Sequence, residues 1–399
     1  MAKKKIPEIK SLYYITHIEN LPSILERGIF SHQLIEEQSL KFTPIYDVSI
    51  VSNRKAKLTP NGKSLWEFAN LYFQPRNPML YRVIHEKGEK ELAIIGVQKQ
   101  AMDAPDVFLT DGNAANDPTS FFTPKEGLKA IYKMWDIIDG EWWNSVDGSK
   151  RKIMAECLVP RMISSDLIHT IYVASHAVAE KVRSLPLPRT FPVVPEPNMF
   201  FIPAKHYPIS TKLAMVEGDM FFSKCQTLTV SVNTVGIMGK GLASRAKYQF
   251  PDVYVTYQDA CRKKALKMGK PFLYKREAPF DDELADDPAT LSVPNGVKWF
   301  LMFATKRHWR DNSDLQGIDE GLQWLVENYK TEGIKSIALP ALGCGLGNLP
   351  WKDVGPIMCR RLSALQIPVF IYLPREREIP IEQLSSEYLL GKTLQNRLL

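Results

Sequence analysis

A lysine surrounded by glycines stands in the segment NTVGIMGKGLA at residues 233–243. Gly236, Gly239 and Gly241 allow positive φ angles and a close approach of the backbone to a ligand, and the residues that follow can begin a helix whose free amide groups attract anions. In the triphosphate-binding Walker A loop Ser or Thr follows the lysine, whereas Gly241 follows Lys240 here. We therefore expect a phosphate-binding loop of another class; a glycine-rich turn without a ligand is the alternative.

A second glycine-rich loop follows the apolar run SIALPAL and contains Gly343, Gly345 and Gly347. Two such loops, each placed after a strand of one domain, can hold a diphosphate from both sides. The pair of loops therefore favours a diphosphate ligand over a structural turn.

Between the two loops, the segment FATKRHWR places Lys306 after another apolar run. A lysine amine whose pKa is lowered can form a Schiff base with an opened ribose aldehyde. We expect the neighbouring cations Arg307 and Arg310 to lower this pKa. Lys240 is the alternative nucleophile. The other interpretation of the cationic segment is a solvated surface loop with no catalytic role.

In the first half of the chain, residues suited to glycosidic chemistry lie in three separate segments. Glu156 stands in the strand-like run KIMAECLV, His17 and Asn20 in ITHIENLPSILERG, and Arg54 in VSNRKAKL. A carboxylate such as Glu156 can stabilise the positive charge that develops on a ribose when its glycosidic bond breaks. The alternative is a half-exposed glutamate at a sheet edge, with ordinary surface groups around it.

The elements that must position these residues differ between the halves of the chain. The runs SLYYITH, MLYRVIH, LAIIGV, KIMAECLV and HTIYVA predict short strands, and NLPSILERG predicts a helix, which together favour an α+β fold. Later, the apolar runs TLTVSVNTVG, WFLMFAT and KSIALPAL alternate with helical patterns such as DEGLQWLVENYKTEG. That alternation predicts a layered α/β domain with ligands at the carboxyl ends of its strands.

Seven prolines between residues 183 and 208 mark the boundary between these halves. We place the first domain at 1–207, a linker at 208–211, the second domain at 212–375 and a C-terminal tail at 376–399. The stretch APFDDELADDPATLSVPNGVK interrupts the second domain, and its acidic residues and prolines predict a surface insertion.

Bulk properties are consistent with two domains in a 399-residue chain. A net charge of +7 permits a polyanionic partner. No apolar run approaches the roughly 18 residues of a membrane span, and the basic N-terminus lacks a signal-type apolar stretch, so we expect a cytoplasmic protein with no membrane partner. Five widely spaced cysteines form no zinc pattern, and we expect reduced thiols and no metal.

The second half resembles macrodomains, and among them the antitoxin DarG, through GDMF, NTVGIMGKGLA, FATKRHWR and ALPALGCGLG. The resemblance covers roughly residues 212–375 and implies a three-layer α/β/α domain that hydrolyses ADP-ribose from DNA, with Lys306 as the catalytic lysine. It implies that ADP-ribose is bound by Asp219 at the adenine, Asn233 at the distal ribose, and Gly239, Gly241, Gly343, Gly345 and Gly347 in the two loops. DarG proteins carry a further C-terminal region that restrains the toxin; only residues 376–399 follow here, so we do not expect that form of inhibition.

The first half resembles the DarT family of DNA ADP-ribosyltransferase toxins, over roughly residues 8–206. The motifs are YYITHIENLPSIL, NRKAKL, LYFQPRNPMLYRV, TDGNAAND and KIMAECLV. The resemblance implies NAD as the substrate, bound by His17, Asn20 and Arg54, with Glu156 and Arg54 as catalytic residues. It also implies transfer of ADP-ribose to a base, commonly thymine, in single-stranded DNA, for which our candidate contacts are Arg76, Met79 and Asn113.

Together, the two resemblances predict a toxin and its antidote on one chain, the first domain modifying single-stranded DNA and the second acting on ADP-ribosylated DNA. One alternative is a macrodomain that only binds ADP-ribosylated DNA without hydrolysis. Another is a transferase that acts on guanine, RNA or protein.

Overall fold

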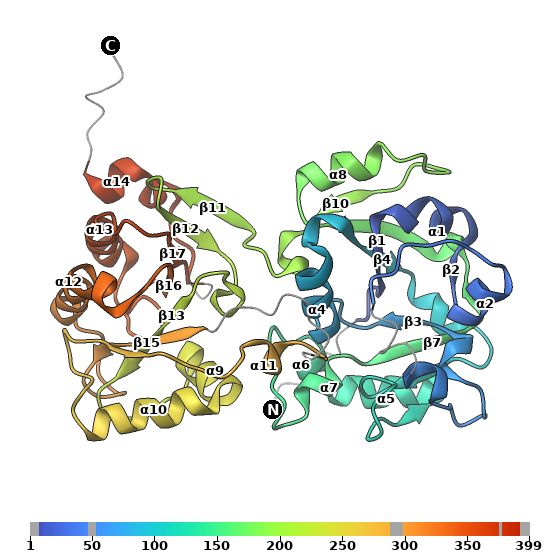
Figure 1. Cartoon of the computed structure of the whole chain (residues 1–399), viewed down its shortest axis with the longest axis horizontal. Helices are drawn as coiled ribbons and strands as arrows, with labels where there is room; N and C mark the ends of the chain where they lie inside the picture. The colour runs from blue at the N-terminus through green and yellow to red at the C-terminus, as the bar shows by residue number, and fades with distance from the viewer. Residues whose placement is uncertain (1–7, 47–52, 288–297, 375–376, 392–399) are drawn as a thin grey trace, which may run out of the picture. The chain divides into compact units, whose positions relative to one another are not determined.

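The computed structural model describes residues 8–46, 53–287, 298–374 and 377–391. These residues form two compact units (Figure 1). The first unit contains residues up to Phe200 together with 281–287, and the second contains the remaining described residues. Each unit has its own sheet and its own hydrophobic core.

The first unit is built on an eight-stranded sheet in the order β10-β9-β4-β1-β3-β7-β5-β6. Neighbouring strands run antiparallel except β10 and β9, which are parallel. The strands are β1 (Leu12–His17), β3 (Phe68–Tyr72), β4 (Leu92–Val97), β5 (Phe108–Thr110), β6 (Phe121–Phe122), β7 (Glu156–Pro160), β9 (Ile168–Val173) and β10 (Val193–Pro195). A small second sheet pairs β2 (Ile29–Phe30) with β8 (Met162–Ile163).

Short helices surround this sheet. They are α1 (Leu21–Arg27), α2 (His32–Glu37), α4 (Pro78–Lys87), α5 (Pro124–Lys133), α6 (Trp135–Ile138), α7 (Ser149–Lys152), α8 (His176–Arg183) and α11 (Asp281–Leu284). The helix predicted from NLPSILERG is confirmed as α1.

The strand predicted from MLYRVIH is wrong, because these residues belong to helix α4. The Asn77 side chain accepts a hydrogen bond from the Leu80 amide at 3.0 Å, and Pro78 occupies the first helical turn. Both features favour helix initiation. The β-prone composition of the run was therefore overridden by its N-terminal cap.

Of the stretch predicted as a surface insertion, residues 288–297 lie outside the described residues, and residues 281–287 are partly buried rather than a surface insertion. Asp281 is 2% exposed, and Leu284 and Ala285 are fully buried. Residues 281–287 pack with the first unit although they lie, in sequence, between two strands of the second. The apolar pair within the acidic run provides the buried contact that charge composition alone concealed.

The second unit has a seven-stranded sheet in the order β11-β12-β17-β16-β13-β15-β14. The five central strands are parallel, and the edge strands β11 and β14 are antiparallel. The strands are β11 (Lys205–Pro208), β12 (Leu213–Glu217), β13 (Thr227–Asn233), β14 (Phe272–Tyr274), β15 (Trp299–Lys306), β16 (Ile337–Pro340) and β17 (Val369–Tyr372).

Helices cover both faces of this sheet (Figure 1). Helices α12 (Leu315–Glu332) and α13 (Trp351–Leu362) pack on one face, and α9 (Gly241–Gln249) and α10 (Pro251–Arg262) on the other. The result is the predicted three-layer arrangement. In the part of the chain that the structure describes, no helix is both long enough and apolar enough to cross a membrane.

The division between the units differs from the boundaries expected from proline content. Strand β11 pairs with β12 in the second unit, and the expected linker 208–211 contains the turn of this hairpin, where the Ile209 amide donates to the Leu213 carbonyl at 2.9 Å. Within the expected tail, Leu384 and the α14 residue Leu389 (α14, Ser386–Leu390) are buried in the core of the second unit.

Two candidate active sites

The carboxylate of Glu156 is fully buried at the start of β7. Arg54 Nη1 donates to its Oε1 at 3.2 Å and Arg54 Nη2 donates to Oε2 at 2.9 Å. The Ala114 amide donates to Oε1 at 2.8 Å. A buried carboxylate needs such compensation, so the alternative of a half-exposed edge glutamate is wrong.

The Glu156 carboxylate also changes the pKa of Arg54. Burial lowers the pKa of the guanidinium, but the adjacent carboxylate of Glu156 raises it by more, so the net pKa shift is upward. Arg54 therefore stays protonated, and it neutralises Glu156 without being able to take a proton from a substrate.

The loop that contains Asn113 supplies the Ala114 amide. The Asn113 side-chain oxygen accepts from the Ala115 amide at 3.0 Å, and Thr119 donates to the Asn113 carbonyl at 2.7 Å. Asn113 thus holds the loop that carries Ala114 against Glu156. Ala114 was not predicted, because a backbone donor leaves no signal in residue type.

His17 and Asn20 lie at the end of β1 and in the turn after it. The Asn20 amide donates to the Thr43 carbonyl at 2.8 Å, and its oxygen accepts from the Thr43 amide at 2.8 Å. His17 Nδ1 accepts from the Glu19 amide at 3.2 Å. Within the described residues, neither side chain hydrogen-bonds Arg54 or Glu156; each organises the chain around it.

The DNA candidates Arg76 and Met79 lie immediately before and within the first turn of α4. Arg76 is 6% exposed, and its guanidinium donates to the Glu141 carbonyl. Met79 is half-buried. Arg76 therefore anchors the stretch after α6 to the start of α4.

An aromatic cluster near Arg54 was not predicted. The His32 ring stacks on Trp66 with centroids 4.2 Å apart, and a hydrogen bond of 3.0 Å joins His32 Nδ1 and the Tyr46 hydroxyl. Burial, followed by the charge of Arg54, lowers the pKa of His32 to about 4. His32 is therefore neutral at neutral pH.

In the second unit, Asn233 and Lys306 pair in register at the carboxyl ends of the parallel strands β13 and β15. Asn233 Nδ2 donates to the Ile237 carbonyl at 2.6 Å, and its Oδ1 accepts from the Val235 amide at 3.0 Å and the Tyr257 hydroxyl at 2.9 Å. Asn233 thus shapes the first glycine loop as well as facing the strand end that carries Lys306.

The Lys306 amine donates to the carbonyls of Asp311 and Leu346, at 2.7 and 3.2 Å. Its pKa is lowered by burial, and Asp311 opposes the shift. The lowered pKa agrees with the expectation, but its cause is burial rather than the charges of Arg307 and Arg310.

The two glycine loops lie next to each other. A Cβ added to Gly241 would lie 3.2 Å from Leu346 of the second loop. A Cβ on Gly347 would meet the Ser313 hydroxyl and lie 2.6 Å from the Gly343 carbonyl, whereas a Cβ on Gly345 would meet nothing within 4 Å. Gly347 is therefore required by packing, and Gly345 leaves space. Gly239 has only Ile237 nearby, at 4.0 Å, and Lys240 precedes α9 as its N-cap residue.

Asp219, expected at the adenine, makes a buried ion pair that was not predicted. Both of its carboxylate oxygens accept from Arg245 Nη1 at 2.8 Å, and the guanidinium lies 4.4 Å from the Phe221 ring centroid. Asp219 also accepts from the Phe221 amide at 3.1 Å. The pair fixes the carboxylate at the end of β12.

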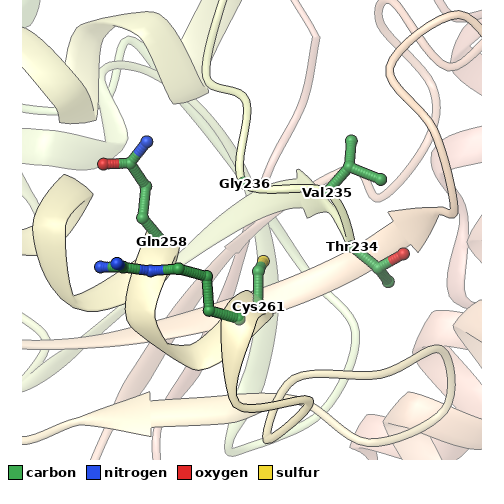
Figure 2. Close-up of a pocket in the computed structure, with 6 residues that line it drawn as sticks. Thr234, Val235, Gly236, Gln258 and Cys261 are labelled. Atoms are coloured by element: carbon green, nitrogen blue, oxygen red, sulfur yellow. The ribbon is translucent and has the colours of Figure 1, made fainter.

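A pocket of about 440 Å³ adjoins the first loop (Figure 2). Thr234, Val235 and Gly236 line it from the turn after β13, and Gln258 and Cys261 from α10. The Thr234 amide donates to the Arg307 carbonyl at 3.0 Å, so the pocket lies beside the segment that carries Lys306. Among the described residues, no group of three or more His, Cys, Asp or Glu side chains could hold a metal ion.

Comparison with known proteins covers both units. Residues 13–201 match the family model of the ssDNA thymidine ADP-ribosyltransferase DarT, and residues 291–358 match the macro domain. A DNA ADP-ribosyl glycohydrolase of Thermus aquaticus is 36% identical over 165 residues, which cover 41% of this chain and 42% of that protein.

A relative from Thermosipho africanus matches nearly the whole chain. This DNA ADP-ribosyl transferase-DNA ADP-ribosyl glycohydrolase fusion protein is 56% identical over 385 residues, which cover 96% of this chain and 99% of the relative. The solved structure of Thermosipho africanus DarTG in complex with ADP-ribose superposes with a TM-score of 0.90 at 55% identity, covering 96% of this chain and 100% of that one. The predicted order of a transferase fold and a macrodomain is confirmed, and the chain belongs to the DarTG family of transferase–glycohydrolase fusion proteins.

Proposed function

We propose that the first unit transfers ADP-ribose from NAD to a thymine base in single-stranded DNA and that the second unit removes it. The observation that carries this proposal is the buried Glu156 carboxylate, held by Arg54 and the Ala114 amide in the unit that matches DarT. A carboxyl group fixed at this depth beside a guanidinium suits a reaction in which positive charge develops on a ribose.

In the transferase step, the bond between ribose C1′ and the nicotinamide nitrogen breaks, and its electron pair leaves with neutral nicotinamide. The carboxylate of Glu156 stabilises the positive charge on the ribose. A thymine ring nitrogen then forms the new bond to C1′ and loses its proton, which Glu156 accepts, because Arg54 stays protonated. A base in single-stranded DNA is accessible without the cost of unpairing a duplex.

In the reverse step, the Lys306 amine attacks the ribose carbon that bears the base. The bond to the base nitrogen breaks and the base takes up a proton. The bond between C1′ and the ribose ring oxygen then opens, the ring oxygen takes up a proton, and the resulting Schiff base on Lys306 is hydrolysed by water to free ADP-ribose and the amine. Lowering of the Lys306 pKa by burial increases the fraction of the nucleophilic neutral amine. Lys306 lies opposite Asn233 at the strand ends, and its amine contacts the Leu346 carbonyl of the second glycine loop.

The remaining predicted residues take the following proposed roles. His17 and Asn20 border the NAD site; Arg76, Met79 and Asn113 border the DNA site; Asp219, Asn233, Gly239, Gly241, Gly343, Gly345 and Gly347 border the ADP-ribose site. For Asp219 the ion pair with Arg245 implies that any contact with adenine uses a carboxylate already held in place.

The test uses the Lys306→Ala chain, because modified DNA should accumulate when the macrodomain cannot remove the ADP-ribose. It is incubated with NAD and with matched single-stranded DNA and RNA oligonucleotides that contain one thymine or uracil, or one guanine, and the added mass is located by fragmentation. We expect ADP-ribose on thymine in DNA and none when Glu156→Gln is added. Modification of guanine, RNA or protein would show that the transferase acts on that substrate instead of thymine in DNA. Failure of the unmutated chain to release ADP-ribose would show that the macrodomain binds ADP-ribosylated DNA without hydrolysing it.

A further inference from the structure

The acidic segment 281–287 meets helix α4 through its carboxylates. Arg82, 1% exposed, donates from Nε to Asp286 at 2.7 Å and from Nη1 to Glu86 of its own helix at 3.0 Å. The Tyr81 hydroxyl donates to Asp281 at 3.0 Å. The segment therefore supplies negative charge to a guanidinium that is closed off from solvent.

The same segment meets a second stretch of the first unit through its backbone. Trp143, which is fully buried, donates from Nε1 to the Leu284 carbonyl at 3.2 Å. Lys150 of α7 donates from Nζ to the Asp282 carbonyl at 2.7 Å. The contacts thus join α4 to the 143–150 stretch through one strip of chain.

The four hydrogen bonds from Tyr81, Arg82, Trp143 and Lys150 to the segment all run in one direction. In these four bonds Tyr81, Arg82, Trp143 and Lys150, which we call the donor surface, act as donors and the segment acts as acceptor. The DNA backbone is likewise an acceptor with regular negative charge, and proteins hold it with Arg, Lys, Tyr and other donors. The donor surface therefore has the chemistry of a strand-binding site, and an aromatic residue within it can also stack on a base.

The donor surface adjoins the transferase centre. Tyr72 pairs with Glu156 across β3 and β7. Burial raises the pKa of Tyr72; the carboxylates of Glu156 and Asp286 raise it further, and the guanidinium groups of Arg54 and Arg82 oppose them. The charged groups of the transferase centre and of the donor surface with its segment therefore both act on Tyr72. In addition, helix α7, which carries Lys150, ends shortly before β7 begins.

We propose that the donor surface binds the backbone of single-stranded DNA and that segment 281–287 occupies it as an internal competitor. This inference rests on the proposed function and adds a regulatory contact to it. The segment carries five acidic residues in seven positions, so its charge density approaches that of a nucleic-acid strand. DNA must displace it before the donor surface can contribute to binding.

The decisive variant neutralises the segment while keeping its shape, with Asp281→Asn, Asp282→Asn, Glu283→Gln, Asp286→Asn and Asp287→Asn in the Lys306→Ala chain. Binding of a fluorescent single-stranded oligonucleotide is measured by anisotropy without NAD, and the KM for DNA with NAD. If the segment occupies the donor surface about nine-tenths of the time in the parent chain, the Kd and the KM for DNA should both fall roughly tenfold in the variant, with little change in kcat. DNA binding should also depend more steeply on salt, because more phosphates are neutralised.

A matched control changes the net charge equally at exposed acidic residues elsewhere in the first unit: Glu26→Gln, Asp103→Asn, Asp106→Asn, Asp166→Asn and Glu180→Gln. Equal DNA affinity in the control and the segment variant would overturn the inference, since charge alone would explain the gain. Adding Lys150→Ala to the segment variant should weaken DNA binding again. An unchanged DNA affinity after this addition would also count against the inference.

A purely structural role for the segment gives a different result. If the segment only completes the fold, neutralising it lowers the melting temperature and the kcat without tightening DNA binding, which would overturn the inference. Failure of the proposed function is distinguishable, because the parent Lys306→Ala chain would then modify no DNA although the anisotropy comparison still reports on the donor surface.

Discussion

The guanidinium of Arg54 binds both carboxylate oxygens of Glu156, although 102 positions separate the two residues in the sequence. Glu156 is fully buried, and the side chain of Arg54 is 16% exposed. A charge at this depth is stable only with its partner, so the pair is a requirement of the fold as well as of the proposed chemistry.

Arg54→Ala should therefore lower the free energy of unfolding of the first unit by about 3–5 kcal/mol, because it removes the cation that is paired with a buried carboxylate. Glu156→Gln should cost less stability and reduce transfer of ADP-ribose by roughly a hundredfold or more, as for other losses of transition-state charge stabilisation. Denaturant unfolding and single-turnover modification of an oligonucleotide measure the two effects. Full activity in Glu156→Gln would remove this carboxylate from the mechanism.

The release of ADP-ribose should become faster as pH rises, because the attacking Lys306 amine must be neutral. Since burial lowers the Lys306 pKa, the rise should be complete at a lower pH than the ordinary lysine value of about 10.4 allows. Lys306→Arg keeps the charge without the nucleophile and should abolish release. The measurement is the rate of release from a modified oligonucleotide across pH, and a release rate independent of pH would argue against amine attack.

The second glycine loop offers a matched pair of substitutions. Gly347→Ala should destabilise the macrodomain, because its Cβ would meet the Ser313 hydroxyl and the Gly343 carbonyl. Gly345→Ala should leave the melting temperature unchanged, since its Cβ enters open space, but should weaken ADP-ribose binding if the loop wraps the phosphates. Thermal unfolding and calorimetric titration with ADP-ribose separate the effects. Unchanged ADP-ribose affinity in Gly345→Ala would place the phosphates elsewhere.

His32 should make the first unit sensitive to acid. Its pKa in the folded chain is lowered to about 4, whereas an unfolded histidine titrates near 6.5. The unfolded chain therefore binds the extra proton between these values, so the stability contributed by neutral His32 is complete above about 6.5 and is lost as pH falls toward 4, by about 3 kcal/mol in total. His32→Phe should remove this part of the stability–pH curve, and an unchanged curve would contradict the assignment.

The sequence predicted those parts of the molecule whose signals are local. The apolar runs that end at Asn233 and Lys306 form adjacent parallel strands, which is why the two residues meet at one edge of the sheet. Glycine content likewise identified both loops, because close packing around Gly347 admits no side chain.

The unpredicted parts depend on contacts between distant segments or on backbone atoms. Arg245 reaches Asp219 from the next layer of the fold, and Ala114 acts through its amide rather than its side chain. The docking of 281–287 joins residues about 200 positions apart, as in the bond from Tyr81 to Asp281. The composition of that segment predicted a surface location because its charged residues outnumber the buried Leu284 and Ala285.

The discontinuity of the first unit has a consequence for how such a gene can be divided. A fragment that stops at residue 207 contains the whole eight-stranded sheet but lacks 281–287, and a fragment that starts at 208 carries those residues away from the unit in which they pack. Recombination that exchanged the macrodomain as one block would therefore also exchange a part of the transferase. The two units therefore alternate along the sequence, and neither can be exchanged as a single contiguous block.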